Sequence, residues 1–308
     1  MSGFLAALLP IVFVVALGRY IGWRGWITPE GWRSIERLAY VILLPALVIR
    51  ALATTGFSDA PWLLAGALVI GQLALFALGF LARFWPGLPR PAVGSIIQSN
   101  SRWNTFVALS LGESLFGAEG LALVTLAAAA MIPAANVLAV YGLVAHADST
   151  GKPRQRPIAA LARNPIIIAC IIGIGLALLN IPLPPLADET LRILAQAAIA
   201  LGLLSAGAGI NISALKLAGV PTVFWALARL LLLPIISVGS AMAFGLTGMS
   251  LFIVLICAST PTAISGYILS RELGGDAPLS ANLIALQTLL ATLTMPLLWF
   301  VLMQFAQA

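Results

Sequence analysis

The sequence contains little charge, few cysteines and almost no histidine, and each scarcity excludes a class of protein. Charged residues make up 8% of the 308 residues, hydrophobic residues make up 61%, and the mean hydropathy is +1.07. A soluble domain of this length would not hide so much apolar surface, so the composition predicts that a lipid bilayer surrounds the chain. The two cysteines exclude a disulfide-based scaffold. With a single histidine and no His-Glu-x-x-His pattern, we expect no enzyme, no metal site and no cofactor.

The long apolar stretches predict an all-α polytopic membrane protein with ten transmembrane helices. The predicted spans are 4–23, 39–55, 61–83, 91–115, 119–146, 158–180, 188–213, 220–245, 250–272 and 278–306. Of the 16 basic residues, twelve lie in loops that follow odd-numbered spans, two lie in the other loops, and Arg102 and Arg229 lie within spans. Positive charge between apolar spans is typical of membrane topology rather than of nucleic-acid binding, so we expect no nucleic-acid partner. The asymmetry predicts cytoplasmic loops after odd-numbered spans and both termini on the outer side, which for a bacterial inner membrane is the periplasmic side.

The hydrophobic pattern repeats at an offset of about 157 residues, which predicts two homologous halves. Residues 1–150 hold the first five spans and residues 151–308 hold the second five. Because five is an odd number, the second half is inverted relative to the first. The matched residues are Pro10 with Pro165, Glu30 with Asp188, Gln72 with Arg229, and Gly117 with Gly274 and Gly275.

Polar residues interrupt the fourth span of each half, which predicts two broken helices, numbers 4 and 9. In the first break, Gln98, Asn100, Arg102, Asn104 and Thr105 interrupt the apolar run. Arg102 stays charged at the depth of the membrane, so it must face a cavity or a protein interior with a partner. Two hypotheses follow: Arg102 binds an anionic substrate, or it pairs with Glu113 or backbone carbonyls and only holds the break. Asn104 is a natural N-cap for the second half-helix, whose free N–H groups favour anions.

The second break lies at Ser259, Thr260, Pro261 and Thr262. Here Thr260 as N-cap and Pro261 at the first helical position predict a fresh helix start, although a simple proline kink is the alternative. The inverted repeat predicts that the two breaks cross near the middle of the membrane and that Ser265 adds a hydroxyl group there.

Other polar residues within the spans carry weaker signals. Asn136 lines the path or makes an interhelical hydrogen bond, and Asn211 and Gln287 fit interhelical bonds best. Glu113 is a candidate gate, a proton site or a partner for Arg50. The long side chain of Arg229 is expected to snorkel to the cytoplasmic edge. The stretch 29–37 predicts an amphipathic interfacial helix without chemistry of its own.

Several of these motifs together resemble the auxin efflux carrier family, in its bacterial branch. They are Pro10 and Gly18 in the first span, Leu44 to Leu47 in the second, Arg102 to Thr105 leading to Leu115 to Gly117, Asn164 and Pro165, Ile181 to Pro185, Arg229 to Pro234, and Thr260 to Thr262. The resemblance implies two inverted five-helix repeats with crossed helices 4 and 9, similar in fold to bile acid:sodium symporters. It also implies a scaffold of helices 1, 2, 6 and 7, a moving transport domain of helices 3–5 and 8–10, and carboxylate substrates such as malate or malonate. The first break carries Arg102 and no proline, unlike many relatives, so plant-type hormone specificity does not carry over.

The leading functional hypothesis is therefore a secondary-active carrier of small organic anions that works by alternating access. The predicted substrate site comprises Arg102, Asn104, Thr105, Asn100, Thr260, Pro261, Thr262, Ser259 and Asn136, and the predicted coupling or gating residues are Glu113, Gln98 and Ser265. A cation/proton antiporter or a sodium-coupled symporter of the same architecture is the alternative, with Na⁺ or H⁺ as the coupling ion. The antiporter needs carboxylates at the breaks, which contain none. Small residues such as Gly202 and Ser205 would also permit a homodimer.

Overall fold

The computed structural model describes residues 2–54, 61–147, 165–210, 219–263 and 265–307, and its regular structure in those ranges is entirely helical. The helices of the first half are α1 (Ser2–Arg24), α2 (Pro29–Leu38), the π-helical turn η1 (Ala39–Leu43), α3 (Leu44–Ala53), α4 (Pro61–Gly79), the 3-10 turn η2 (Phe80–Phe84), α5 (Arg90–Ser101) and α6 (Thr105–His146). Those of the second half are α8 (Pro165–Leu178), α9 (Pro185–Ala208), α11 (Val220–Ala243), α12 (Gly248–Ser259), α13 (Ser265–Glu272) and α14 (Ala277–Gln307). The predicted all-α class is confirmed.

The described helices confirm a protein that crosses the membrane several times. Six segments are long and apolar enough to span a bilayer: Gly3–Arg24, Trp62–Phe84, Arg90–His146, Pro185–Ala208, Val220–Ala243 and Ala277–Phe305. The third of them contains 57 residues and two of the predicted spans, which are separated by a kink at Gly117, where φ is 62°. The predicted spans 39–55 and 250–272 are each divided into two short helices, and part of 158–180 lies outside the described residues. The count of ten therefore stays a prediction.

The surface and the interior have the polarity expected for a protein surrounded by lipid. Large apolar side chains face outward, with 71% of Phe13, 82% of Leu186 and 71% of Leu293 exposed. Conversely, Arg229 is the one charged side chain among the described residues that is fully buried. An apolar exterior around a few buried polar groups is the arrangement that a bilayer favours.

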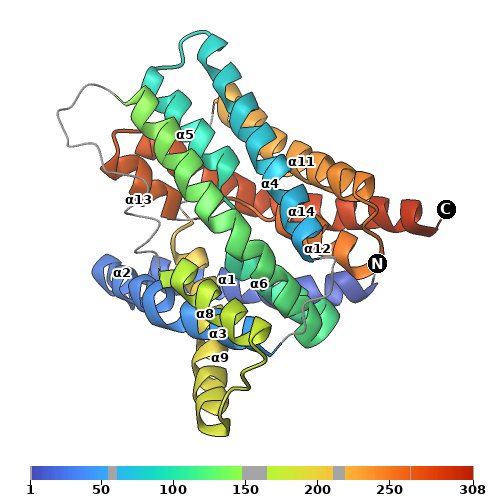
Figure 1. The fold of residues 1–308 in the computed structure, drawn as a ribbon. Helices are drawn as coiled ribbons and strands as arrows, with labels where there is room; N and C mark the ends of the chain where they lie inside the picture. Colours follow the sequence, from blue (N-terminus) through green and yellow to red (C-terminus); the bar gives the residue numbers. More distant parts are fainter. Residues whose placement is uncertain (1, 55–60, 148–164, 211–218, 264, 308) are drawn as a thin grey trace.

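The helices pack in two groups, which Figure 1 shows in its lower and upper parts. In the lower group α1 packs along α9, and α3 packs along α8 and α9. In the upper group α4 packs along α11 and α6, α5 packs along α6, and α12 and α14 pack on α11 and on each other. The lower part of α6 contacts α1, α3 and α9, so this helix connects the two groups.

Glycines allow the helices of the lower group to approach very closely. A Cβ atom added to Gly207 of α9 would lie 1.8 Å from the carbonyl oxygen of Val15 in α1, and one added to Gly18 of α1 would lie 2.0 Å from that of Leu204. A Cβ added to Gly202 would lie 2.3 Å from the ring of Phe106 in α6. Gly202, one of the small residues that suggested a homodimer, thus packs against a residue of the same chain, and the homodimer stays a prediction.

Candidate functional site

The first break separates α5 from α6 in the way the sequence predicts. Helix α5 ends at Ser101, and Arg102 is extended, with φ −98° and ψ 158°. Asn104 caps α6, because its side-chain oxygen accepts a hydrogen bond of 3.3 Å from the N–H of Val107. The predicted N-cap is confirmed. Since the first N–H groups of α6 have no partner within the helix, they form a centre of partial positive charge beside Arg102.

The second break differs from the prediction in where the helix restarts. Helix α12 ends at Ser259, Thr260 is extended and residues 261–263 are not helical, whereas α13 covers Ser265–Glu272. The Thr260 hydroxyl donates a hydrogen bond of 3.0 Å back to the carbonyl of Cys257, so it completes α12 rather than capping a new helix. The N–H of Thr262 donates to the Gln287 side chain at 2.9 Å. The prediction that Thr260 and Pro261 start the second half-helix is therefore wrong.

Arg102 brings the two breaks together. Its guanidinium donates a hydrogen bond of 2.8 Å from Nη2 to the hydroxyl of Ser265 and one of 3.3 Å from Nη1 to the side-chain oxygen of Asn136. Its Nε has no partner among the described residues. The ion pairs formed between described residues involve other arginines, so the predicted alternative of an Arg102–Glu113 pair is wrong. The charge of Arg102 therefore faces neutral partners.

A cavity of about 400 Å³ lies in front of Arg102. The first break and α6 line it together with Ala263 and Ser265 at the second break, and α2, η1, the start of α3 and α9 complete the lining. Its lining residues are Arg33, Glu36, Arg37, Ala39, Tyr40, Leu44, Arg102, Trp103, Asn104, Thr105, Phe106, Ile132, Ala135, Asn136, Gly202, Ser205, Ala206, Ala263 and Ser265. Mostly apolar walls with a few convergent polar groups are typical of small-molecule sites.

Apart from Glu113, which lines a second cavity described below, the predicted site residues fall into two sets. Those that line the cavity are Arg102, Asn104, Thr105, Asn136 and Ser265. The others are buried in the packing around the breaks and are absent from the described lining: Gln98, Asn100, Ser259, Thr260, Pro261 and Thr262. Within this second set, Asn100 donates to the carbonyl of Leu75 at 3.4 Å, and Gln98 donates to Ser280 at 3.4 Å.

The side chain of Gln287 in α14 forms hydrogen bonds with both breaks. It accepts from the N–H of Thr262 and donates a hydrogen bond of 3.1 Å to the hydroxyl of Ser99. The predicted interhelical role of Gln287 is confirmed. Asn211, for which the same role was predicted, lies outside the described residues.

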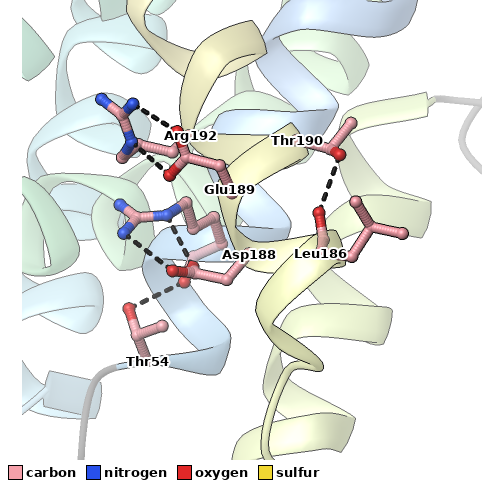
Figure 2. A network of polar contacts seen from close by, with 7 residues as sticks. Thr54, Leu186, Asp188, Glu189, Thr190 and Arg192 are labelled. Atoms are coloured by element: carbon pink, nitrogen blue, oxygen red, sulfur yellow. Dashed lines mark hydrogen bonds and ion pairs between the residues drawn. The ribbon is translucent and has the colours of Figure 1, made fainter.

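A second cavity, of about 510 Å³, lies further along the same α6–α9 contact. Ser110 and Glu113 of α6 face it, together with Arg50 of α3 and Arg192 of α9. Two ion pairs involve these arginines: Arg50 pairs with Asp188 at 2.7 Å, and Arg192 pairs with Glu189 at 2.6 Å. Figure 2 labels Asp188, Glu189 and Arg192 in this network. Asp188, rather than the predicted Glu113, is therefore the carboxylate partner of Arg50. The contact of Phe106 with Gly202 lies between the two cavities along both helices.

Comparison with known sequences assigns the chain to a family. The profile of a family described as membrane transport protein matches residues 4–299. The chain belongs to this family. Its membership confirms the resemblance to auxin efflux carriers and makes the protein a membrane transporter, not an enzyme.

Two relatives are similar to this transporter over most of their length, and both carry names without a substrate. An uncharacterized transporter of Methanothermobacter thermautotrophicus is 22% identical over 303 residues, which cover 96% of this chain and 97% of the relative. The uncharacterized transporter YfdV of Escherichia coli K12 is 22% identical over 278 residues, which cover 87% of this chain and 88% of the relative. The site of this transporter must therefore be argued from its own residues.

Sequence reasoning missed the contribution of α2 to the cavity. The stretch 29–37 forms the predicted amphipathic helix, with Thr28 as its N-cap. However, Arg33, Glu36 and Arg37 line the cavity, so this helix has more than an anchoring role. The spacing of these three residues, at i, i+3 and i+4, places them on one helical face and is the signal that could have revealed them.

Glu36 is the one carboxylate among the described residues that line the cavity. Burial raises the pKa of Glu36 above its ordinary value, and nearby Arg33 partly opposes the rise in pKa. As the pH falls, Glu36 therefore takes up a proton at a higher pH than an exposed carboxylate would. Protonation removes a negative charge from a cavity that also holds three arginines.

We expect the apparent affinity for an anionic substrate to rise as the pH on the side of α2 is lowered through the pKa of Glu36. In Glu36→Gln this part of the pH dependence should be absent, and the affinity at neutral pH should be higher by roughly threefold to tenfold. Transport of the same substrate by both proteins, measured between about pH 5 and pH 8, checks this. Protonation of the substrate affects both proteins equally, so a difference between their pH profiles comes from Glu36. Glu119→Gln, outside both cavities, is the control; parallel pH profiles for all three proteins would contradict the prediction.

Proposed function

We propose that this transporter is a secondary-active carrier of small organic anions, with carboxylates such as malate or malonate as substrates. The observation that carries the proposal is the Arg102 guanidinium, which lies at the cavity wall and donates hydrogen bonds to two neutral side chains, those of Asn136 and Ser265. A permanent cation in a membrane protein is costly unless something compensates its charge. A bound carboxylate would do so through two parallel N–H···O bonds, a geometry that guanidinium favours.

The start of α6 adds to the attraction for an anion. Thr105 and Phe106 begin this helix at the wall of the cavity, directly after the Asn104 cap. The N–H groups of a first helical turn favour negative charge. Arg33 and Arg37 line the same cavity, so its electrostatic character suits an anion along its length.

We further propose the architecture in which this site would operate: ten helices in two inverted repeats, residues 1–150 and 151–308, with the broken spans four and nine crossing. The two breaks support it through the Arg102–Ser265 hydrogen bond. The matched glycines Gly117 and Gly274 also support it, because both have positive φ, at 62° and 77°, which favours glycine over other residues.

The helix packing supports the proposed division into a scaffold and a moving domain. Spans 1, 2, 6 and 7 correspond to α1, α3, α8 and α9, which pack on one another. The two cavities lie along the contact between α6 and the scaffold helix α9. The contact of Phe106 with Gly202 lies between them. Sliding of α6 against the scaffold would expose Arg102 to each side in turn, which is alternating access. The twelve-to-two distribution of loop arginines and lysines supports both termini on the outer side, the periplasmic side in the proposed bacterial inner membrane.

The test is charge movement in proteoliposomes of the purified protein, after concentration jumps of malonate, malate and indole-3-acetate, with and without sodium. We expect a saturable current with malonate or malate, and its dependence on sodium or pH would identify the coupling ion. Silence with all three anions, together with a response to sodium or pH jumps alone, would overturn the proposal in favour of cation transport. Protein-free liposomes made with the same lipids are the control.

A further inference from the structure

Arg229 of α11 contacts the ends of both broken half-helices. Its guanidinium donates a hydrogen bond of 2.8 Å from Nη1 to the carbonyl of Ala258, next to the last residue of α12. It donates two more to the carbonyl of Arg102, the extended residue directly after α5, at 3.0 Å from Nη2 and 3.3 Å from Nε. The side chain is fully buried, so the prediction that it snorkels to the membrane edge is wrong. One side chain thus joins both breaks.

Gln72 makes the equivalent contact in the first half. Its side-chain nitrogen donates to the carbonyl of Ser101 at 2.9 Å and to that of Met131 at 3.2 Å. Residues 72 and 229 are 157 apart, and so are residues 101 and 258. The same contact therefore occurs at the same place in both halves, with one difference: only the arginine also reaches the break of the other half.

The carbonyls that Arg229 binds are sites of negative charge. The last carbonyl groups of a helix have no partner within it, and the C-terminal end of a helix carries about half a negative charge. Two such ends, those of α5 and α12, lie close to Arg102. Without compensation they would repel an anion bound there. The fork of the guanidinium satisfies both ends with one fixed positive charge, which neither lysine nor glutamine does.

We infer that Arg229 is a positioning residue: it fixes the main chain of Arg102 between the two breaks and thereby directs the Arg102 guanidinium into the cavity. It also offsets the negative ends of α5 and α12. The consequence for anion binding rests on the proposed function, whereas the consequence for the main chain does not. Gln72 is its counterpart at the first break alone.

Arg229→Gln places in the second half the glutamine that the first half has at Gln72. The variant should keep a donor for the carbonyl of Ala258 and lose the hydrogen bonds to the carbonyl of Arg102. We expect amide hydrogen exchange without substrate to rise on the order of tenfold in peptides covering 98–106, with little change in α1 and α9. Gln72→Leu is the matched control, and it should raise exchange at the first break but not in 256–263. Arg229→Lys, which keeps the charge, serves if the glutamine variant does not fold. Unchanged exchange of Arg229→Gln in 98–106, or a uniform rise along the whole chain, would overturn the inference.

A second measurement separates positioning from a general loss of structure. In transport assays with malonate, Arg229→Gln should weaken apparent affinity on the order of tenfold, and add almost nothing in an Arg102→Lys background. Additive effects of the two substitutions would count against a role exerted through Arg102. If the unmodified protein moves no carboxylate at all, the proposed function fails, and the hydrogen-exchange result alone decides the role of Arg229.

Discussion

Arg102→Ala should abolish saturable carboxylate transport while the amount of folded protein in the membrane stays unchanged. The substitution removes the guanidinium whose described hydrogen-bond partners, Asn136 and Ser265, are neutral. Two charge-assisted hydrogen bonds to a carboxylate contribute about 1.5–3 kcal/mol each, so affinity should fall by about 100-fold or more. Folding should tolerate the change, because the partners left behind are neutral and border a cavity. Currents in proteoliposomes measure the effect.

Two further variants show whether position and charge both matter. Arg102→Lys keeps the charge but loses the planar fork, so it should retain weak transport with raised KM. Arg83→Ala removes an exposed arginine that stacks on Phe84 outside both cavities, and it should transport normally. Malonate currents in Arg102→Ala equal to those of the unmodified protein would show that the arginine has only a structural role.

Gly207→Ala should strongly destabilise the protein. The added methyl group would lie 1.8 Å from the carbonyl oxygen of Val15 and 2.8 Å from the backbone nitrogen of Arg19. Backbone atoms of α1 cannot move aside as a flexible side chain can, so α1 and α9 must separate along their contact. Overpacking of this kind costs about 3 kcal/mol or more, which corresponds to a fall of roughly 10 °C in the unfolding midpoint.

Thermal unfolding in detergent, followed by size-exclusion chromatography, measures this midpoint. Gly175→Ala in α8 is the matched control, because a Cβ atom there has no neighbour within 4 Å. It should leave the midpoint unchanged or raise it slightly, since alanine favours a helix over glycine. Equal midpoints for the two variants would show that α1 and α9 do not pack as closely as described.

Local sequence chemistry predicted the first break well and the second poorly. Asn104 caps α6 as expected, because capping depends on one side chain and an amide three residues away. Thr260 and Pro261 have the same capping chemistry, yet α13 starts only at Ser265. The Thr260 hydroxyl donates a hydrogen bond to the carbonyl of Cys257, and the N–H of Thr262 donates one to the side chain of Gln287. A side chain from α14, 25 residues further along the chain, thus helps to decide where the helix restarts.

Long side chains were the hardest to place from the sequence. Arg229 was expected to extend toward the membrane edge. Instead, its guanidinium donates hydrogen bonds to carbonyl groups at two breaks that lie far apart in the sequence. Likewise, α2 was read as an anchor, although Arg33, Glu36 and Arg37 line the cavity with Arg102. Both errors have one cause: amphipathic patterns specify which face is polar, but not which other element that face meets.

The sequence by itself determined the membrane environment, the all-helical class, the family and the positions of the two breaks. These follow from composition, hydrophobic period and local polar runs, which act over a few neighbouring residues. Only the tertiary structure decided which polar residues meet at the cavity, that Asp188 pairs with Arg50, and that Arg229 joins both breaks. The physical reason is that each of these contacts joins residues from different helices, whose relative placement depends on the packing of the whole chain.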